Sequence, residues 1–299
     1  MINGLHIELT NKCTLKCPRC SRTEFIKQFP HAWKNQDLDL QDLKKFIDVD
    51  LAGKKILLCG NYGDPIYHND MIEFVRFFKE KKARVRIATN GSYKSIDWWT
   101  ELSKVLSYDD EIVFAIDGLP KNFTKSWING DWKSIADGIR IMRESKVTMI
   151  WQYIRFSYNI DDVNTAETLS KQLGFDSFTV MDSNRWDNGT EWLTPNINNV
   201  SLAKINWGSD SDVTIDADCS TNDQHFISAE GRYTPCCFSS EHRFYYKTKF
   251  YKEKNAYDIK ETTLSAVLNY PTTVEFFKTI HIAKPDVCTF SCPKVETDV

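Results

Sequence analysis

The sequence lacks three features that would place it in a special class of protein. None of its apolar runs approaches the roughly 18 residues that cross a membrane. Its formal charge of -3 gives no basic excess of the kind that binds nucleic acid generally. No charged and apolar leader precedes the first apolar segment, because residues 1–4 lead directly into it. We therefore expect a cytoplasmic protein with no membrane partner, and nothing in the composition favours a nucleic-acid partner.

The sequence also lacks the context of a disulfide-stabilised protein. Its nine cysteines are odd in number and belong to a chain of 299 residues, whereas disulfide frameworks are typical of small secreted domains. Eight of the cysteines fall into two groups that are far apart in the sequence. The first group is near the start of the chain and the second is near its end: Cys13, Cys17 and Cys20, and then Cys219, Cys236, Cys237, Cys288 and Cys292. This distribution predicts two metal centres. Cys59 lies alone in an apolar strand, where we expect a small buried hydrophobe.

Short β-rich runs alternate with segments of helical period up to about Asp182. We expect strands over Leu5–Thr10, Lys55–Cys59, Arg84–Thr89, Glu111–Ile116, Thr148–Phe156 and Ser177–Met181. We expect helices over Leu38–Val49, Met71–Phe78, Ile96–Leu106, Trp132–Arg143 and Val163–Leu173, with Asp70 as a cap and Gly174 as a stop. This alternation predicts six βα units whose strands form a parallel sheet. We therefore expect a fold of the α/β class, an open partial (βα)6 barrel that is TIM-like.

After Asp182 the composition changes to Asn, Asp, Ser and Trp, which predicts a long loop over residues 184–189 and a domain boundary. We therefore assign residues 1–182 to the barrel and 183–299 to a small C-terminal α+β domain. Residues 226–234 read as a β-hairpin with Gly231 at the turn, which would bring Cys219 and Cys236 together. Short helices are expected over residues 264–268 and 274–280.

Cys13, Cys17 and Cys20 have the spacing C-x3-C-x2-C directly after the first predicted strand. Three thiolates on one tight loop can hold three irons of a four-iron cube and leave the fourth iron open to a substrate or cosubstrate. The spacing alone would also fit a zinc protein. An iron-sulfur centre with an open iron would indicate chemistry rather than electron storage.

The first strand and its cysteine loop resemble the radical S-adenosylmethionine (SAM) superfamily, whose hallmark is this spacing after the first strand of a partial βα barrel. The segment Gly60-Asn61-Tyr62-Gly63-Asp64-Pro65 resembles the family's glycine-rich element, with Asp in place of the usual Glu. The resemblance implies that SAM is bound by Gly60, Gly63, Asp64, Thr89, Asn90, Asp117 and Asn159. Arg19 occupies a position that is usually aromatic and packs near the adenine, so the adenine contacts are left unassigned.

The later cysteines resemble the start and end of the SPASM auxiliary-cluster motif, in a shortened form similar to a "twitch" domain. The resemblance implies one auxiliary [4Fe-4S] cluster, the second cluster of the chain, ligated by Cys219, Cys236, Cys288 and Cys292, with Cys237 as a rival ligand. The alternative is a structural zinc site, because four cysteines suit tetrahedral zinc equally well.

The resemblance implies an enzyme that reductively cleaves SAM to a 5'-deoxyadenosyl radical, which then removes a hydrogen atom from a C–H bond. We expect oxidation or functionalisation of a small metabolite or peptide, with electrons from an external one-electron reductant such as a flavodoxin or ferredoxin. Two alternatives remain open, a noncatalytic zinc-binding interaction protein and a radical SAM enzyme that modifies nucleic acid. Candidate substrate residues at predicted strand ends and in the next loop are Arg155, Asp182, Arg185 and Trp186.

Overall fold

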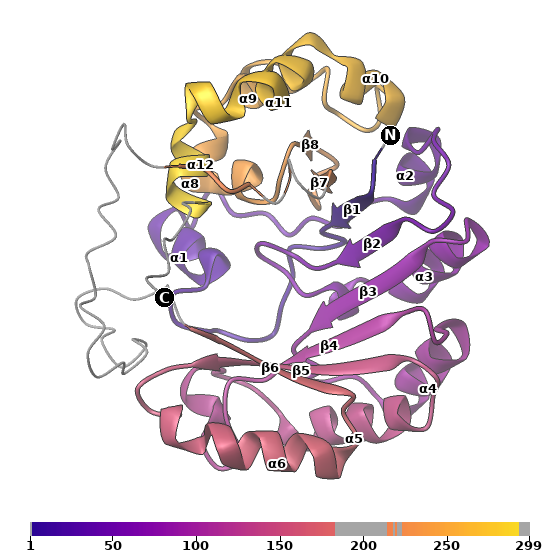
Figure 1. Cartoon of the computed structure of the whole chain (residues 1–299), viewed down its shortest axis with the longest axis vertical. Coiled ribbons are helices and arrows are strands. Elements are labelled where there is room, and N and C mark those ends of the chain that lie inside the picture. The colour runs from indigo at the N-terminus through magenta and orange to yellow at the C-terminus, as the bar shows by residue number, and fades with distance from the viewer. Residues whose placement is uncertain (1, 183–213, 218, 220–222, 293–299) are drawn as a thin grey trace.

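The computed structural model describes residues 2–182, 214–217, 219 and 223–292. One eight-stranded sheet organises these residues, in the order β6-β5-β4-β3-β2-β1-β7-β8 (Figure 1). The strands are β1 (Gly4–Ile7), β2 (Lys55–Leu58), β3 (Arg84–Thr89), β4 (Glu111–Ala115), β5 (Thr148–Arg155), β6 (Ser177–Asp182), β7 (Gln224–Ile227) and β8 (Tyr233–Thr234). All neighbouring pairs are parallel except β7 and β8. Parallel strands place their carboxyl ends along one edge, which is where sites form in such sheets.

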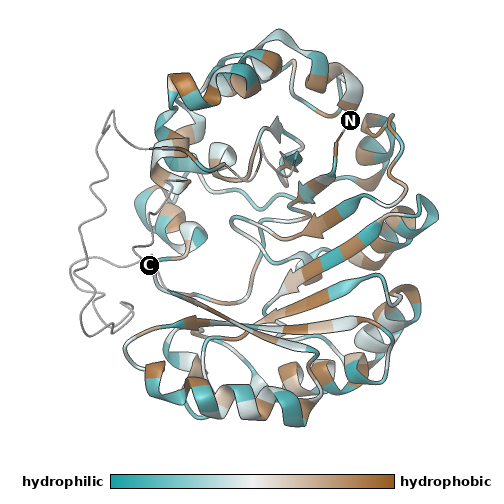
Figure 2. Cartoon of the chain, in the orientation of Figure 1, coloured by the Kyte–Doolittle hydropathy of each residue, from teal (hydrophilic) through white to brown (hydrophobic). Residues whose placement is uncertain are grey.

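Helices follow the strands and cover one face of the curved sheet (Figure 1). Those of the first 182 residues are α1 (Ser21–Gln28), α2 (Leu40–Phe46), α3 (Met71–Glu80), α4 (Ile96–Val105), α5 (Trp132–Arg143) and α6 (Val163–Leu173). The later ones are α8 (His242–Tyr245), α9 (Lys249–Lys252), α10 (Leu264–Asn269), α11 (Pro271–Ala283) and α12 (Asp286–Ser291). Figure 2 shows hydrophobic residues along the central strands and a mixture of hydrophobic and hydrophilic residues on the outer helices, as expected of a core between sheet and helices.

Alternation along β1 divides the sheet into a core face and a concave face. Leu5 and Ile7 are fully buried in the main core, which also contains Trp99 of α4 and Trp151 of β5. The intervening His6 lines a cavity on the opposite face. Because side chains of a strand alternate between faces, β1 contributes both to the core and to the concave interior.

The predicted order of six βα units is confirmed, and Gly174 ends α6 in the left-handed conformation with φ of 85°. The prediction that Asp70 is the cap residue of α3 is confirmed in position, although its side chain makes no capping hydrogen bond. Its own N–H donates to His68 Nδ1 at 3.0 Å. The helix α1 was not predicted.

The C-terminal part continues the sheet of the barrel, because β7 pairs in parallel with β1. The predicted hairpin is confirmed as β7 and β8, with Gly231 in the turn at φ of 73°. The expected loop at residues 184–189 lies outside the described residues. Within the described part of the chain, no helix is long and apolar enough to cross a membrane.

Candidate active site and auxiliary thiol cluster

The first cysteine group lies in the loop between β1 and α1, with Cys20 at the N-cap position of α1. All three thiols are half-buried. Negative charge on Cys20 or Cys13 would oppose the ionisation of Cys17. Burial raises the pKa of Cys13 to about 12, and burial also raises that of Cys17 well above its usual range. Thiols that resist ionisation, as Cys13 and Cys17 do, need a strong positive partner to become thiolates, and iron supplies such a charge. The donor set therefore fits a metal cluster.

The glycine-rich loop after β2 packs directly against the end of β1. A Cβ atom on Gly63 would lie 1.8 Å from the carbonyl oxygen of Thr10, so only glycine fits there. Glu8 Oε1 accepts hydrogen bonds from the N–H groups of Tyr62 at 2.7 Å and Gly63 at 3.2 Å. Burial raises the pKa of Glu8 to about 7, although these N–H groups act to lower it. The loop is thus fixed beside the cysteine loop by shape and by a buried carboxyl group.

Asp64 joins this loop to the end of β3. Its carboxylate accepts from Thr89 Oγ1 at 2.8 Å, from the Asn90 N–H at 2.6 Å and from the Ile66 N–H at 3.2 Å. Burial raises the pKa of Asp64 to about 6. Asn90 in turn donates from Nδ2 to Cys13 Sγ at 3.5 Å. The structure therefore connects the predicted SAM residues Asp64, Thr89 and Asn90 to the first cysteine through one chain of hydrogen bonds.

Asp117, after β4, is a second buried carboxyl group on this side of the sheet. It accepts from Trp127 Nε1 and from the Ile154 N–H, each at 3.1 Å. Burial raises its pKa to about 7, and its charge would oppose ionisation of Cys17. Tyr158 donates its hydroxyl to the Asp117 carbonyl oxygen at 2.8 Å. Asp117 is thus held in place near the thiol loop, and its contact with SAM stays a prediction.

Asn159 forms side-chain hydrogen bonds with backbone groups at the ends of β4 and β5. Its Oδ1 accepts from the Phe156 N–H at 2.7 Å, and its Nδ2 donates to the carbonyl oxygens of Ile154 at 3.0 Å and Asp117 at 3.3 Å. Its exposed fraction is 1%. These contacts give Asn159 a part in shaping the strand end, and a contact with SAM stays a prediction.

Two of the four substrate candidates are brought together at the edge of the sheet. Arg155, at the end of β5, forms a bidentate ion pair with Asp182, at the end of β6, with Nε···Oδ1 at 2.7 Å and Nη2···Oδ2 at 2.8 Å. The pair is partly exposed, with 35% and 41% of the side chains accessible. Arg185 and Trp186 lie outside the described residues.

The second cysteine group lines a cavity of about 600 Å³ on the concave face of β1 and β7. The wall contains Cys219, Cys236, Cys237, Cys288 and Cys292. As predicted, the hairpin brings two of these thiols together. The Cys219 thiol hydrogen-bonds Cys236, which lowers the pKa of Cys236 to about 7 and raises that of Cys219. Cys288 and Cys292 also lie close enough to act on the charge of Cys219. Five thiols around one cavity are a donor set that fits an iron-sulfur cluster.

Cys237 differs from the other four thiols in its surroundings. Burial raises its pKa, and the charges that oppose its ionisation are those of Cys236 and Cys59. Cys59 is half-buried, rather than fully buried as expected. Cys237 also lines the cavity of the other four thiols, so the ligand set of Cys219, Cys236, Cys288 and Cys292, with Cys237 as a rival ligand, stays a prediction.

Within the described residues, no three His, Cys, Asp or Glu side chains are placed to hold a single metal ion.

Sequence reasoning missed two contacts between the glycine-rich loop and the segment after Cys237. Asn61 donates from Nδ2 to the Cys237 carbonyl oxygen at 2.7 Å, and the His242 N–H donates to the Tyr62 hydroxyl at 2.7 Å. The only sequence signal is that a polar and an aromatic residue stand between Gly60 and Gly63 in a loop where small residues are usual. The loop beside the first cysteine group is thereby bonded to the segment that carries the second.

Comparison with known proteins identifies the family. The model of the radical SAM superfamily matches residues 7–167, and the model of the SPASM iron-sulfur cluster-binding domain matches residues 219–293. The chain belongs to the radical SAM superfamily. Membership makes it an enzyme whose cofactors are a [4Fe-4S] cluster and SAM, and the SPASM match implies an additional cluster.

Curated relatives match only part of their length. A GTP 3',8-cyclase of Desulforamulus reducens is 29% identical over 47% of this chain and 43% of its own. An AdoMet-dependent heme synthase of Methanosarcina barkeri is 25% identical over 62% of this chain and 52% of its own. The chain thus spans about half the length of the curated relatives it matches.

Solved structures confirm the partial barrel with a small C-terminal domain. BtrN in complex with AdoMet and 2-DOIA is 14% identical, with a TM-score of 0.52 over 100% of this chain and 96% of its own. Streptococcus suis SuiB bound to the precursor peptide SuiA is 13% identical, with a TM-score of 0.63 over 98% of this chain and 72% of its own. At these identities the likeness is one of fold.

Proposed function

We propose that this radical SAM enzyme oxidises or otherwise functionalises a C–H bond of a small polar metabolite or a peptide side chain. The observation that carries the proposal is the position of β1 between two thiol groups. The loop that follows β1 holds Cys13, Cys17 and Cys20, and His6 within β1 lines the cavity of the later cysteines. One strand thus joins a site for radical generation to a site for electron transfer.

The bound cluster and SAM would supply a 5'-deoxyadenosyl radical by one-electron reduction. The protein's own residues prepare the site for this chemistry. Asp64 holds the loops after β2 and β3 together, Asn90 donates to Cys13 Sγ, and Asp117 fixes the loop after β4. Because these carboxyl groups are at least nine-tenths buried, they also mark a region from which water is excluded.

The later cysteines favour an oxidation. Four thiolates from Cys219, Cys236, Cys288 and Cys292 would leave no open iron for substrate, which favours electron transfer over substrate binding at that cluster. We propose that residues 1–182 form the SAM-binding unit and residues 183–299 the auxiliary-cluster unit, with a flavodoxin or ferredoxin as the external electron carrier.

The substrate class rests on the partly exposed ion pair of Arg155 and Asp182. Both groups lie at carboxyl ends of neighbouring strands, where substrates of such sheets are held, and both prefer polar or charged partners. The relatives and neighbours are named for GTP, for heme, for a complex with 2-DOIA and for a complex with a precursor peptide, so they agree with either a metabolite or a peptide.

Anaerobic reconstitution tests the proposal. With dithionite and SAM, the protein should contain about eight irons with matching sulfide and should produce 5'-deoxyadenosine. Cys17→Ala should abolish that product, whereas Cys59→Ala, which removes a thiol outside both proposed ligand sets, should retain it. A colourless protein that contains zinc and produces no 5'-deoxyadenosine would refute the proposal.

A further inference from the structure

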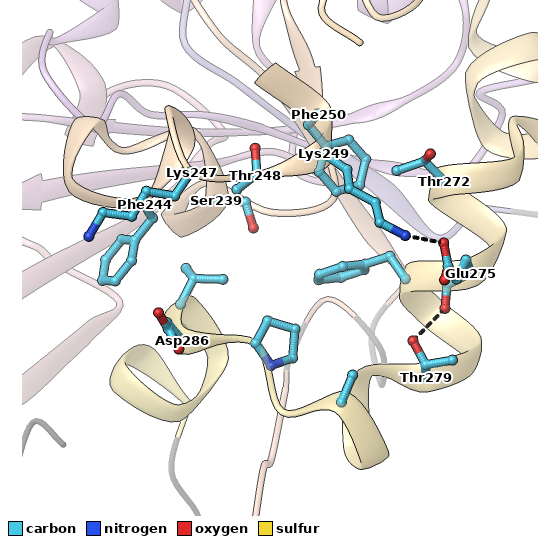
Figure 3. A pocket seen from close by; sticks show the side chains of 14 residues that line it. Ser239, Phe244, Lys247, Thr248, Lys249, Phe250, Thr272, Glu275, Thr279 and Asp286 are labelled. Carbon is cyan, nitrogen blue, oxygen red and sulfur yellow. Dashed lines mark hydrogen bonds and ion pairs between the residues drawn. The ribbon is translucent and has the colours of Figure 1, made fainter. Parts of the chain in front are cut away.

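A second cavity, of about 290 Å³, lies in the C-terminal part of the chain between α8, α9, α11 and α12 (Figure 3). Its apolar wall is formed by Phe244, Phe250, Phe276, Ala283, Pro285 and Val287. The polar groups stand mainly at its rim, where Lys249 turns toward Glu275 and pairs with it at 2.7 Å, while Lys247 extends in a different direction (Figure 3). An apolar centre with charged groups around it is the usual composition of an interaction site.

This cavity adjoins the auxiliary thiols. Ser239 lines it and is 1% exposed, and its N–H donates to Cys236 Sγ at 3.4 Å, with the two side chains 3.3 Å apart. Val287 lines both this cavity and the cavity of the cysteines. A group seated against Ser239 would therefore be separated from Cys236, a proposed ligand of the auxiliary cluster, by the Ser239 side chain.

The segment of residues 243–254, which forms one side of the cavity, is basic in a chain whose net charge is negative. Residues 243–254 contain five basic residues, all exposed, and one acidic residue, whereas the whole chain has a formal charge of -3. Two of the five are paired, Arg243 with Glu241 and Lys249 with Glu275. Outside these two pairs, Lys247, Lys252 and Lys254 stand against two acidic residues, Glu253 of the segment and Asp286 of the cavity lining. The exposed segment thus keeps a positive charge beside the auxiliary thiols.

We propose that this basic segment and the cavity form the docking site of an acidic one-electron carrier protein, whose redox group approaches the auxiliary cluster past Ser239 and Val287. The proposal rests on the proposed function. One electron passes between the carrier and the cluster, so that one is oxidised as the other is reduced, and no bond is formed or broken. Electron-transfer complexes use small, weak interfaces, and complementary charge speeds their association. The charge of residues 243–254 selects an acidic partner.

Binding of a bacterial flavodoxin to the cluster-loaded protein tests the proposal, measured by calorimetric titration at low ionic strength. The double variant Lys247→Glu/Lys252→Glu reverses two exposed charges of the segment, and we expect it to weaken binding by about tenfold, with a smaller dependence on salt. Ala283→Trp narrows the rim of the cavity from an exposed position, and we expect it to weaken binding by about fivefold because the carrier cannot approach as closely.

The matched control is Arg140→Glu/Lys146→Glu, which reverses two exposed charges on and just after α5, on the barrel side of the molecule (Figure 1). It should bind flavodoxin within twofold of the original protein. Unchanged binding in either test variant, or an equal loss in the control, would overturn the docking site.

A separate measurement distinguishes this failure from failure of the proposed function. Dithionite is a small reductant that needs no docking site, so SAM cleavage driven by dithionite should be the same in all these variants. If dithionite yields no 5'-deoxyadenosine in the original protein, the proposed function fails, whatever the affinity for flavodoxin.

Discussion

Glu8 provides a quantitative test of how the glycine-rich loop is held. Its side chain is 2% exposed and is placed to accept hydrogen bonds from the N–H groups of Tyr62 and Gly63, with a further backbone contact at Ala229. Burial raises its pKa from the model-peptide value of 4.5 to about 7, with a smaller contribution in the same direction from the charge of Glu230. A buried carboxyl group that is reluctant to ionise should make the stability of the fold depend on pH.

The sign follows from proton binding. Between the unfolded pKa of 4.5 and the folded pKa of about 7, the folded protein holds the proton of Glu8 more tightly than the unfolded chain does. The stability contributed by this group is therefore greatest at low pH and is lost as the pH rises through that interval. Integration over the two pKa values gives a loss of about 2 kcal/mol in the free energy of unfolding between roughly pH 5.5 and pH 8.

The assay compares Glu8→Gln with the original protein by equilibrium urea unfolding under anaerobic conditions at several pH values. Gln can still accept from both N–H groups through its amide oxygen, so the loop should keep its position. The weaker hydrogen bonds of Gln should lower the free energy of unfolding by about 1 kcal/mol at every pH, and this constant difference does not affect how the free energy of unfolding changes with pH. The difference between the two proteins should change by about 2 kcal/mol across the interval. Parallel curves, within about 0.5 kcal/mol, would refute the account of Glu8 as a buried carboxyl group.

Three further outcomes are expected. Cys17→Ala should lower the iron content from about eight to about four per chain, measured by iron and sulfide analysis, because only the auxiliary cluster keeps all its ligands. Cys288→Ser should destroy that auxiliary cluster and its electron paramagnetic resonance signal while Cys237→Ser retains both, and loss in both variants would contradict the ligand set. Gly63→Ala should prevent stable folding, since its Cβ would overlap backbone atoms, whereas Gly53→Ala, with φ of 70° but open space around it, should cost only about 1 kcal/mol in thermal unfolding.

Much of the barrel could be predicted because its signals are local. The strands β3 and β5 are rich in β-branched and aromatic residues. The helix α5 carries an apolar stripe along its length, from which its extent could be predicted. Gly174 marks the end of α6 because its positive φ favours glycine. The C-x3-C-x2-C spacing indicated the first thiol group for the same reason, since Cys13, Cys17 and Cys20 are close in sequence. The ligand set of the second group came from the family resemblance, because its cysteines are spread over residues 219–292.

Features that depend on distant parts of the chain could not be predicted. The helix α1 begins at Ser21, directly after the N-cap residue Cys20, and Ser21 is its one buried residue, so it has no apolar stripe to identify it. The pairing of β7 with β1 joins segments that are more than 200 residues apart, and no local pattern specifies such a neighbour. Asp64 has most of its partners after β3, which explains why its part in joining two loops was not seen in the motif alone.

The place of β1 in the sheet has a consequence for how the protein is made. This strand lies between β2 and β7, and β7 is synthesised only after roughly three quarters of the chain. Until then, one side of β1 exposes unpaired backbone groups, and contacts between such distant segments form slowly. The ribosome thus synthesises β7 long after Cys13, Cys17 and Cys20. The pairing of β7 with β1, the strand that precedes the loop of these cysteines, is therefore a late step in the folding of the new chain.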